Sequence, residues 1–256
     1  MVERSPGELT PEGKLETLKE KGVVFFDAGL TAQERESAQG IKIENGPSEF
    51  NYYGPINQQL LRELTDYFAK LGNNSAETID AISGLVNRIA DNTAKDFNKD
   101  SVWVNVRTSV QSDEHDIPRR WHRDGQYFTP EEKDGEKEKS YKLVFTIKGP
   151  STRFAEKIDP ERFEQLERRG MENYDANHND NYQKYEQEEI KIRQELATVI
   201  REIDPSTNEQ AVLYLVGDND AKVHAEPTMD SPRIFIQVLP GSKDQISEWK
   251  GGRLDL

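Results

Sequence analysis

A histidine and an aspartate stand two residues apart in the segment PRRWHRDGQYF, residues 118–128. On an extended chain, side chains at positions i and i+2 project to the same side, so His122 and Asp124 can reach one metal ion while Arg123 points elsewhere. An imidazole and a carboxylate supply two ligands, and two ligands do not make a stable site. The pattern therefore requires a third ligand from a distant part of the chain.

His224 is the residue that we expect to complete this set. It is one of four histidines in the chain and lies in AKVHAEP, residues 221–227, which we expect to form a strand. Two histidines and one carboxylate on one face of an octahedral metal leave three positions open, which is typical of non-haem Fe(II) oxygenases, although zinc can bind such ligands too. Taken singly, each histidine is better explained as a hydrogen-bonded turn or core residue; together with Asp124 they favour a metal site.

Arg233 follows His224 by nine positions and stands at the head of the apolar segment RIFIQVLPG, residues 233–241. A buried arginine is costly without a partner, and its planar guanidinium binds a carboxylate through two hydrogen bonds. The carboxylate of a ligand would satisfy it. This arginine favours iron over zinc as the expected metal.

At this point the sequence resembles the Fe(II)/2-oxoglutarate-dependent oxygenases, in particular their phytanoyl-CoA-hydroxylase-like and prolyl-hydroxylase-like members. The matching segments are WHRDGQYF, KGPSTRFAE, VHAEP and SPRIFIQV, in that order, within residues 102–241. The resemblance implies that His122, Asp124 and His224 hold Fe(II). It also implies that Arg233 pairs with the distal carboxylate of 2-oxoglutarate, and that the protein hydroxylates a small-molecule or peptide substrate.

The sequence departs from the family pattern at Phe235, where the family commonly has Ser or Thr two residues after the arginine. A second anchor for the distal carboxylate must therefore come from elsewhere, and Lys142 and Tyr141 are the candidates. We expect Asn105 to contact either the proximal carboxylate of the cosubstrate or the substrate.

The elements that must position these residues are mainly strands. Residues 102–110 alternate between valine or threonine and polar or aromatic side chains, as a strand with two different faces requires. Further strands are expected at 141–149, 211–218, 221–227 and 233–241. Short strands separated by turns indicate a sandwich or jelly roll, and the resemblance implies a double-stranded β-helix. The expected fold class is mainly β with added helices (α+β).

We expect one domain over residues 1–256. Residues 1–100 are predicted to form helices around one short strand, VVFFD, and to pack on the β core at 101–155 and 209–241. Residues 156–208 are highly charged and are predicted to form a helical insertion, a possible lid, whose last helix ends at Asp204-Pro205. Within it, MENYDANHNDNY is predicted to be a polar loop.

Composition excludes several functional classes. A formal charge of −14 opposes binding to nucleic acid or an anionic membrane, and the lack of cysteine excludes disulfides and thiolate ligands. No apolar run reaches membrane-spanning length, and the N-terminus lacks the apolar stretch of a secretory signal, so a cytoplasmic location is expected. Two alternatives stay open: a cupin-type hydrolase or isomerase using Zn, Mn or Ni, and a non-enzymatic jelly-roll binding protein.

Overall fold

The computed structural model describes residues 11–45, 48–110, 117–133, 136–203, 210–217 and 221–254. In chain order the elements are α1 (Pro11–Lys21), β1 (Val23–Asp27), α2 (Ala32–Gly40), β2 (Ser48–Gly54), α3 (Gln58–Lys70), α4 (Ala76–Asp96), β3 (Ser101–Ser109), β4 (Trp121–His122), β5 (Glu132–Lys133), β6 (Glu136–Lys137), β7 (Ser140–Lys148), β8 (Arg153–Ile158), α5 (Pro160–Asn177), α6 (Tyr182–Val199), β9 (Ile200–Glu202), β10 (Gln210–Val216), β11 (His224–Ala225), β12 (Arg233–Gly241) and α7 (Lys243–Leu254).

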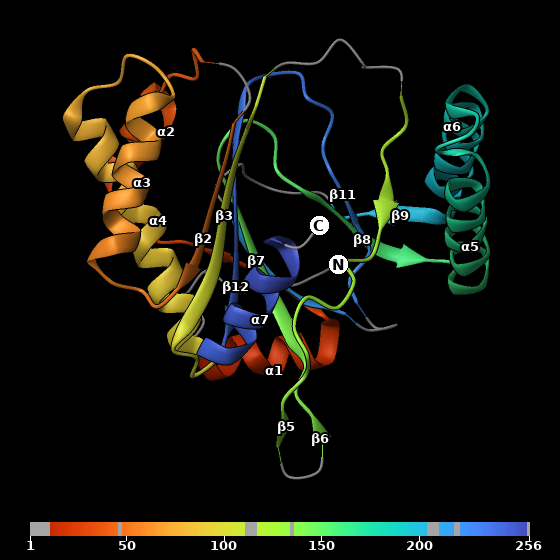
Figure 1. The fold of residues 1–256 in the computed structure, drawn as a ribbon, viewed down its shortest axis with the longest axis horizontal. Coiled ribbons are helices and arrows are strands. Elements are labelled where there is room, and N and C mark those ends of the chain that lie inside the picture. The colour runs from red at the N-terminus through yellow and green to blue at the C-terminus, as the bar shows by residue number, and fades with distance from the viewer. Residues whose placement is uncertain are drawn as a thin grey trace.

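Two antiparallel sheets face each other (Figure 1). The larger has the strand order β1-β10-β7-β12-β3-β2, the smaller has the order β4-β11-β8-β9, and β5 and β6 form a separate hairpin. From β3 to β12 the core strands pass repeatedly between the larger and the smaller sheet. This winding is that of a double-stranded β-helix, so the predicted jelly roll with added helices is confirmed.

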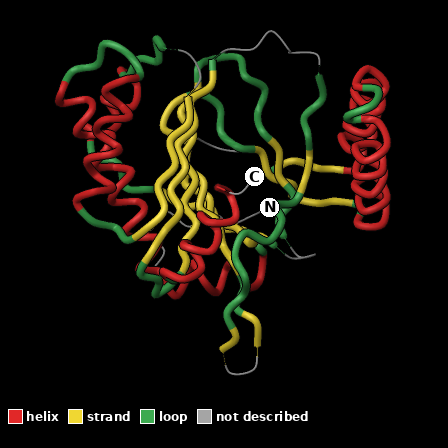
Figure 2. Tube along the Cα trace, viewed as in Figure 1, coloured by secondary structure: helices red, strands yellow, loops and turns green. Residues whose placement is uncertain are grey.

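Helices cover the outer face of the larger sheet, on the left of Figure 2. Alternation along β3 points Val102, Val104 and Val106 toward this layer, where they are fully buried. The layer presents apolar side chains at helical spacing, namely Leu60, Leu64 and Phe68 on α3 and Ile82, Leu85, Val86 and Ile89 on α4. The alternate residues of β3 are thereby directed into the space between the two sheets.

The N-terminal region contains more structure than the sequence predicts. The prediction of one strand there is wrong, because β2 pairs with β3 along the sheet edge, while β1 extends the other edge through β10. The sequence does not indicate β2 as a strand, because polar Glu49 and Asn51 on its inward face interrupt the apolar pattern, while Tyr52 packs on its outward face. Helices α2 and α7 were also not predicted.

The inserted helices α5 and α6 lie side by side against the outer face of the smaller sheet (Figure 1). The contact joins helix residues to strand residues that point away from the other sheet, namely Phe163, Leu166, Ile192 and Leu196 with Trp121, Ala155, Val223 and Ala225. This apolar contact fixes the back of the strands that carry the two histidines.

Two details of the predicted insertion are wrong. Helix α6 ends at Val199, because the next residues form β9 and pair with β8; Asp204 and Pro205 lie outside the described residues. The segment MENYDANHNDNY is mostly helical, since α5 continues to Asn177. Buried Asn173 holds the two helices together there by donating from Nδ2 to the carbonyl oxygen of Tyr185 at 3.0 Å.

Candidate metal and cosubstrate site

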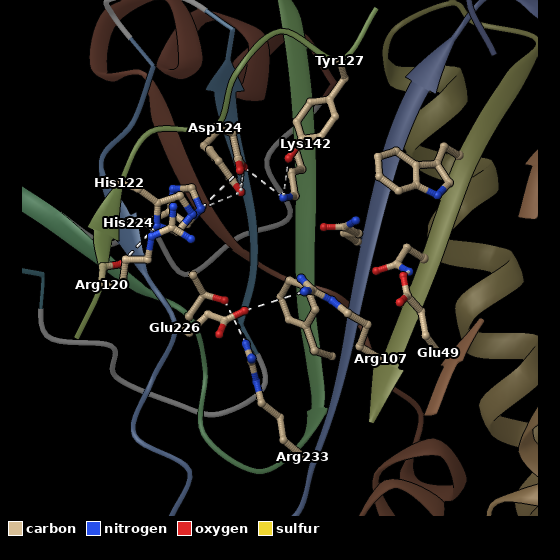
Figure 3. Close-up of a pocket in the computed structure, with 16 residues that line it drawn as sticks. Glu49, Arg107, Arg120, His122, Asp124, Tyr127, Lys142, His224, Glu226 and Arg233 are labelled. Carbon is tan, nitrogen blue, oxygen red and sulfur yellow. Dashed lines mark hydrogen bonds and ion pairs between the residues drawn. The ribbon is translucent and has the colours of Figure 1, made fainter. Parts of the chain in front are cut away.

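Strand pairing brings the two distant histidines face to face. His224 on β11 lies directly opposite His122 on β4, and their ring centroids are 4.4 Å apart. Alternation turns both rings into the space between the sheets, since their neighbours Trp121 and Ala225 pack outward. Asp124 follows β4 in the loop, and one ligand atom from each of the three residues lies within 4.8 Å of the others (Figure 3).

Hydrogen bonds set the tautomer of both histidines. Nδ1 of His122 lies 3.0 Å from the carbonyl oxygen of Arg120, and Nδ1 of His224 lies 3.1 Å from that of Lys222. A carbonyl only accepts, so both Nδ1 atoms carry the proton and both Nε2 atoms keep a lone pair. Burial lowers the pKa of His122, and burial together with the charge of His122 lowers the pKa of His224 to about 3. Both rings are therefore neutral at pH 7.

The carboxylate of Asp124 is held by two donors. Lys142 donates to Oδ2 from Nζ at 2.9 Å, and Tyr214 donates to the same oxygen from its hydroxyl at 2.7 Å. Burial alone would raise the pKa of Asp124, but Lys142, His224 and Tyr214 together hold that pKa well below its usual range. The group is thus a carboxylate at neutral pH.

These residues fit a divalent transition metal. The set offers two neutral imidazole nitrogens and one carboxylate oxygen, and the backbone bonds at both Nδ1 atoms orient the rings as in known metal sites. Ligands from only one side leave open positions toward a cavity of about 300 Å³. Arg123 points away from it, because its guanidinium pairs with Glu167 on α5 at 3.0 Å.

Arg233 lines the same cavity from the first position of β12 (Figure 3). Its side chain is 3% exposed, and Nη2 donates to Thr152 Oγ1 at 3.0 Å. Among the described residues no carboxylate lies within ion-pair distance, and Nε lacks a hydrogen-bond partner. Burial lowers the pKa of Arg233 to about 10, so the group still carries a positive charge at neutral pH. The charge of Glu226 opposes this shift from beyond ion-pair distance. A buried cation without a direct ion-pair partner indicates a ligand that brings a carboxylate.

The two residues suggested as a second anchor face opposite ways. Tyr141 lies on the outer face of the sheet and stacks on Phe97 at 4.8 Å, so its suggested role is wrong. Lys142 lines the cavity but is bonded to Asp124 and to the Tyr127 hydroxyl, at 3.2 Å. Thr152 is the polar contact that the sequence interpretation missed, although it lies in the KGPSTRFAE segment that carried the resemblance.

Asn105 lies on the inner face of β3 and is 1% exposed. Its Nδ2 donates to Glu49 Oε1 at 2.6 Å and to Asn51 Oδ1 at 3.0 Å, so the amide presents its carbonyl oxygen elsewhere. Asn105 lines the same cavity as the three candidate ligands and Arg233.

Comparisons with known proteins were made for the sequence and for the structure. No family model and no curated protein sequence matches the chain. Among solved structures, the dioxygenase for auxin oxidation in rice is 11% identical, with a TM-score of 0.48 and coverage of 96% of this chain and 90% of that one. The Arabidopsis thaliana dioxygenase for auxin oxidation 1, in a 2-oxoglutarate complex, is 9% identical, with a TM-score of 0.43 and coverage of 93% and 90%. HygX from Streptomyces hygroscopicus, with nickel and 2-oxoglutarate bound, is 11% identical, with a TM-score of 0.41 and coverage of 91% and 87%.

Proposed function

We propose that the protein is an Fe(II)- and 2-oxoglutarate-dependent dioxygenase that hydroxylates a small-molecule or peptide substrate. His122, Asp124 and His224 would hold the metal. Arg233 would bind the distal carboxylate of 2-oxoglutarate, with Thr152 beside it. The observation that carries the proposal is the unpaired, buried guanidinium of Arg233 in the same cavity as the three candidate ligands.

Charge accounting supports a dicarboxylate over other ligands. A 2-oxoglutarate dianion would place one negative charge near the metal and one beside Arg233, which has no carboxylate within ion-pair distance among the described residues and feels only the more distant charge of Glu226. A cupin-type hydrolase or isomerase would not need Arg233 to bind the distal carboxylate of a dicarboxylate. Thr152 would add a hydroxyl donor beside the guanidinium. It would replace the Ser or Thr hydroxyl that the related family has at the position of Phe235.

When bound, Fe(II) with 2-oxoglutarate supplies oxidative decarboxylation coupled to oxidation of a substrate C–H bond. The residues of the chain bind and orient around that chemistry. The carbonyl oxygens of Arg120 and Lys222 keep both imidazoles in the ligating tautomer. Phe235 lines the cavity and lies against the Arg233 guanidinium, while Phe154 packs on the His224 ring. An apolar, water-poor wall beside Arg233 strengthens the ion pair that the guanidinium would make.

Succinate formation tests the proposal. Purified protein given Fe(II), ascorbate, oxygen and 2-oxoglutarate should form succinate slowly even without substrate, and His224→Ala should abolish this. Omission of Fe(II) or replacement by Zn(II) is the matched control. Equal succinate formation in His224→Ala and the parent protein, or binding of Fe(II) without any effect of 2-oxoglutarate, would contradict the proposal.

We found no helix among the described residues that is long and apolar enough to cross a membrane. For the substrate itself, the cavity volume of about 300 Å³ is compatible with a small molecule or with one side chain of a peptide.

A further inference from the structure

Two buried amides form part of the cavity wall beyond the candidate metal ligands. Asn105 on β3 and Gln237 on β12 lie directly opposite each other in the strand register, and they are 1% and 5% exposed. Asn105 Oδ1 and Gln237 Oε1 are buried and have no hydrogen-bond partner among the described residues. Buried carbonyl oxygens without a donor are rare in folded proteins. A ligand with N–H or O–H donors would satisfy both.

The orientation of Asn105 is fixed by its surroundings. Its Nδ2 faces Glu49 Oε1, Asn51 Oδ1 and the carbonyl oxygen of Phe50, at 2.6, 3.0 and 3.2 Å. A flipped amide would direct its own oxygen at these three acceptors, which is unfavourable. The unpartnered atom of Asn105 is therefore an acceptor.

Glu49 adds a negative charge at this wall (Figure 3). Of the cavity's carboxylates, Asp124 pairs with Lys142 at 2.9 Å and Glu226 with Arg107 at 3.7 Å. Glu49 accepts hydrogen bonds from Asn105 and Asn51, but across the described part of the chain no cationic side chain lies within ion-pair distance of it. We call Glu49, Asn105 and Gln237 the acceptor wall.

Aromatic rings border the acceptor wall. Trp103 and Tyr127 both line the cavity, and their rings meet edge to face with centroids 5.6 Å apart. Aromatic faces attract ammonium groups as well as apolar carbon. The acceptors, the carboxylate and the rings together favour one chemical class, an organic amine in its protonated form. They disfavour an anion, so 2-oxoglutarate would be directed to Arg233 instead.

We propose that the acceptor wall binds the ammonium group of the substrate, and hence that the enzyme oxidises an amine-bearing molecule or residue. This inference rests on the proposed oxygenase function for the reaction, and on the acceptor wall alone for the substrate class. The ammonium group donates to Asn105 Oδ1 and Gln237 Oε1 and pairs with Glu49, while the carbon skeleton lies between the aromatic rings and the metal ligands.

A matched pair of probes tests the amine class. The full-length protein, loaded with Zn(II) as a diamagnetic stand-in and with 2-oxoglutarate, is titrated with 2-phenylethylammonium and with 2-phenylethanol by ligand-observed NMR. We expect the amine to bind at least about tenfold more tightly than the alcohol, because it is charged and has more donors. Equal affinity for both probes in the parent protein would overturn the proposal.

Three substitutions locate the binding. Glu49→Gln should remove most of the preference for the amine, whereas Glu226→Gln, which alters a carboxylate already paired with Arg107, should keep it. Gln237→Leu should weaken amine binding by about threefold or more while leaving the melting temperature equal or higher, since it removes an unpartnered buried carbonyl. An unchanged preference in Glu49→Gln, or a destabilised Gln237→Leu that binds the amine normally, would contradict the acceptor wall.

The same titrations separate this inference from the proposed function. They are repeated on metal-free protein, and 2-oxoglutarate binding is measured on its own. Preference for the amine without any binding of 2-oxoglutarate would support the acceptor wall and contradict the oxygenase. Binding of 2-oxoglutarate without preference for the amine would support the oxygenase and contradict the acceptor wall.

Discussion

Lys142 donates a hydrogen bond from Nζ to Asp124 Oδ2 at 2.9 Å, and the two side chains are only 5% and 10% exposed. The lysine therefore holds the carboxylate that would also ligate the metal. Burial lowers the pKa of Lys142, while the charge of Asp124 opposes this shift. In the metal-free protein, each of these two groups is the principal counter-charge of the other.

Replacement of this lysine should cost stability that a metal ion can restore. In Lys142→Met the carboxylate of Asp124 stays buried without its cation, which typically destabilises a fold by about 3–5 kcal/mol. A divalent metal would supply the missing charge, so Zn(II) should stabilise the variant more than the parent protein. Urea unfolding with and without Zn(II) measures both effects.

Lys95→Met is the control for that measurement, because Lys95 pairs with Asp91 on the surface and is 70% exposed. Its effect should stay below about 1 kcal/mol and should not depend on metal. Metal-free Lys142→Met that is as stable as the parent protein would show that the buried pair does not hold the site together.

Acid should destabilise the metal-free protein well above the pH at which its carboxylates titrate. Burial lowers the pKa of His224 from 6.5 to about 3, so between these values the unfolded chain takes up a proton that the folded protein does not. Stability is therefore present above pH 6.5 and is lost as pH falls. From pH 6.5 to 5 the loss should be about 1.5 kcal/mol for this histidine, and His122, whose pKa burial also lowers, acts in the same direction.

Urea unfolding at pH 6.5, 6 and 5 checks this dependence. His224→Phe should flatten it, because this variant lacks the histidine that takes up the proton on unfolding. An identical dependence in His224→Phe and the parent protein would place the proton uptake at other groups.

Arg233 should control the affinity for 2-oxoglutarate and leave metal binding almost unchanged. Removal of one partner of a buried charged pair costs on the order of 2–5 kcal/mol, so Arg233→Met should weaken 2-oxoglutarate binding by roughly 30-fold or more. Anaerobic calorimetry with Fe(II) measures both affinities. Arg107→Met is the control, because Arg107 packs on the same Phe235 ring but is 41% exposed and pairs with Glu226. An Arg233→Met protein with full affinity for 2-oxoglutarate would exclude Arg233 as the anchor of the distal carboxylate.

Much of the fold and the candidate site was predictable because both rest on strong local patterns. Alternation along residues 102–110 and the apolar strands at 141–149 and 233–241 correctly gave the central strands β3, β7 and β12. The i, i+2 spacing predicted that His122 and Asp124 share one side, and the resemblance to the oxygenase pattern implied that His224 joins them. These features depend on side-chain periodicity, which sequence displays directly.

The remaining elements depend on contacts that the local sequence does not display. β2 is an edge strand with a polar inner face, and its place beside β3 is known only once the sheet exists. Helix α2 did carry a signal, since Thr31 and Glu34 form a capping box, and that signal was overlooked. Thr152 reaches Arg233 across 81 positions, and the unpartnered oxygens of Asn105 and Gln237 become visible only in the packed structure.

Gly149 should be essential to the position of Arg233. Its φ of +84° is a left-handed conformation, and a Cβ there would lie 2.6 Å from the carbonyl oxygen of Pro232 and 2.9 Å from Arg233 Cα. Gly149→Ala should therefore destabilise the protein by about 2 kcal/mol or more and weaken 2-oxoglutarate binding. Gly84→Ala, in the open on helix α4, should be neutral or stabilising. Thermal unfolding and calorimetry of the two variants provide the comparison, and equal stability would contradict the predicted clash.

The helical insertion should prove to be two parts with different roles. Its base packs Phe163, Leu166, Ile192 and Leu196 against the smaller sheet, so deletion of residues 156–208 should unfold the domain by exposing the back of the histidine-bearing strands.

The tip of the insertion, residues 171–186, carries exposed Met171, Tyr174 and Tyr182, and neither α5 nor α6 contributes a described residue to the cavity lining. Replacement of the tip by a short Gly/Ser linker should therefore keep the fold, metal binding and 2-oxoglutarate binding. If the insertion is a lid, the tip deletion should still change turnover. Loss of a lid admits water, so more succinate should form for each molecule of substrate oxidised. Circular dichroism, calorimetry and the ratio of succinate to oxidised substrate distinguish these outcomes: a folded tip deletion with a raised ratio would establish the lid, and an unchanged ratio would leave the insertion with a structural role alone.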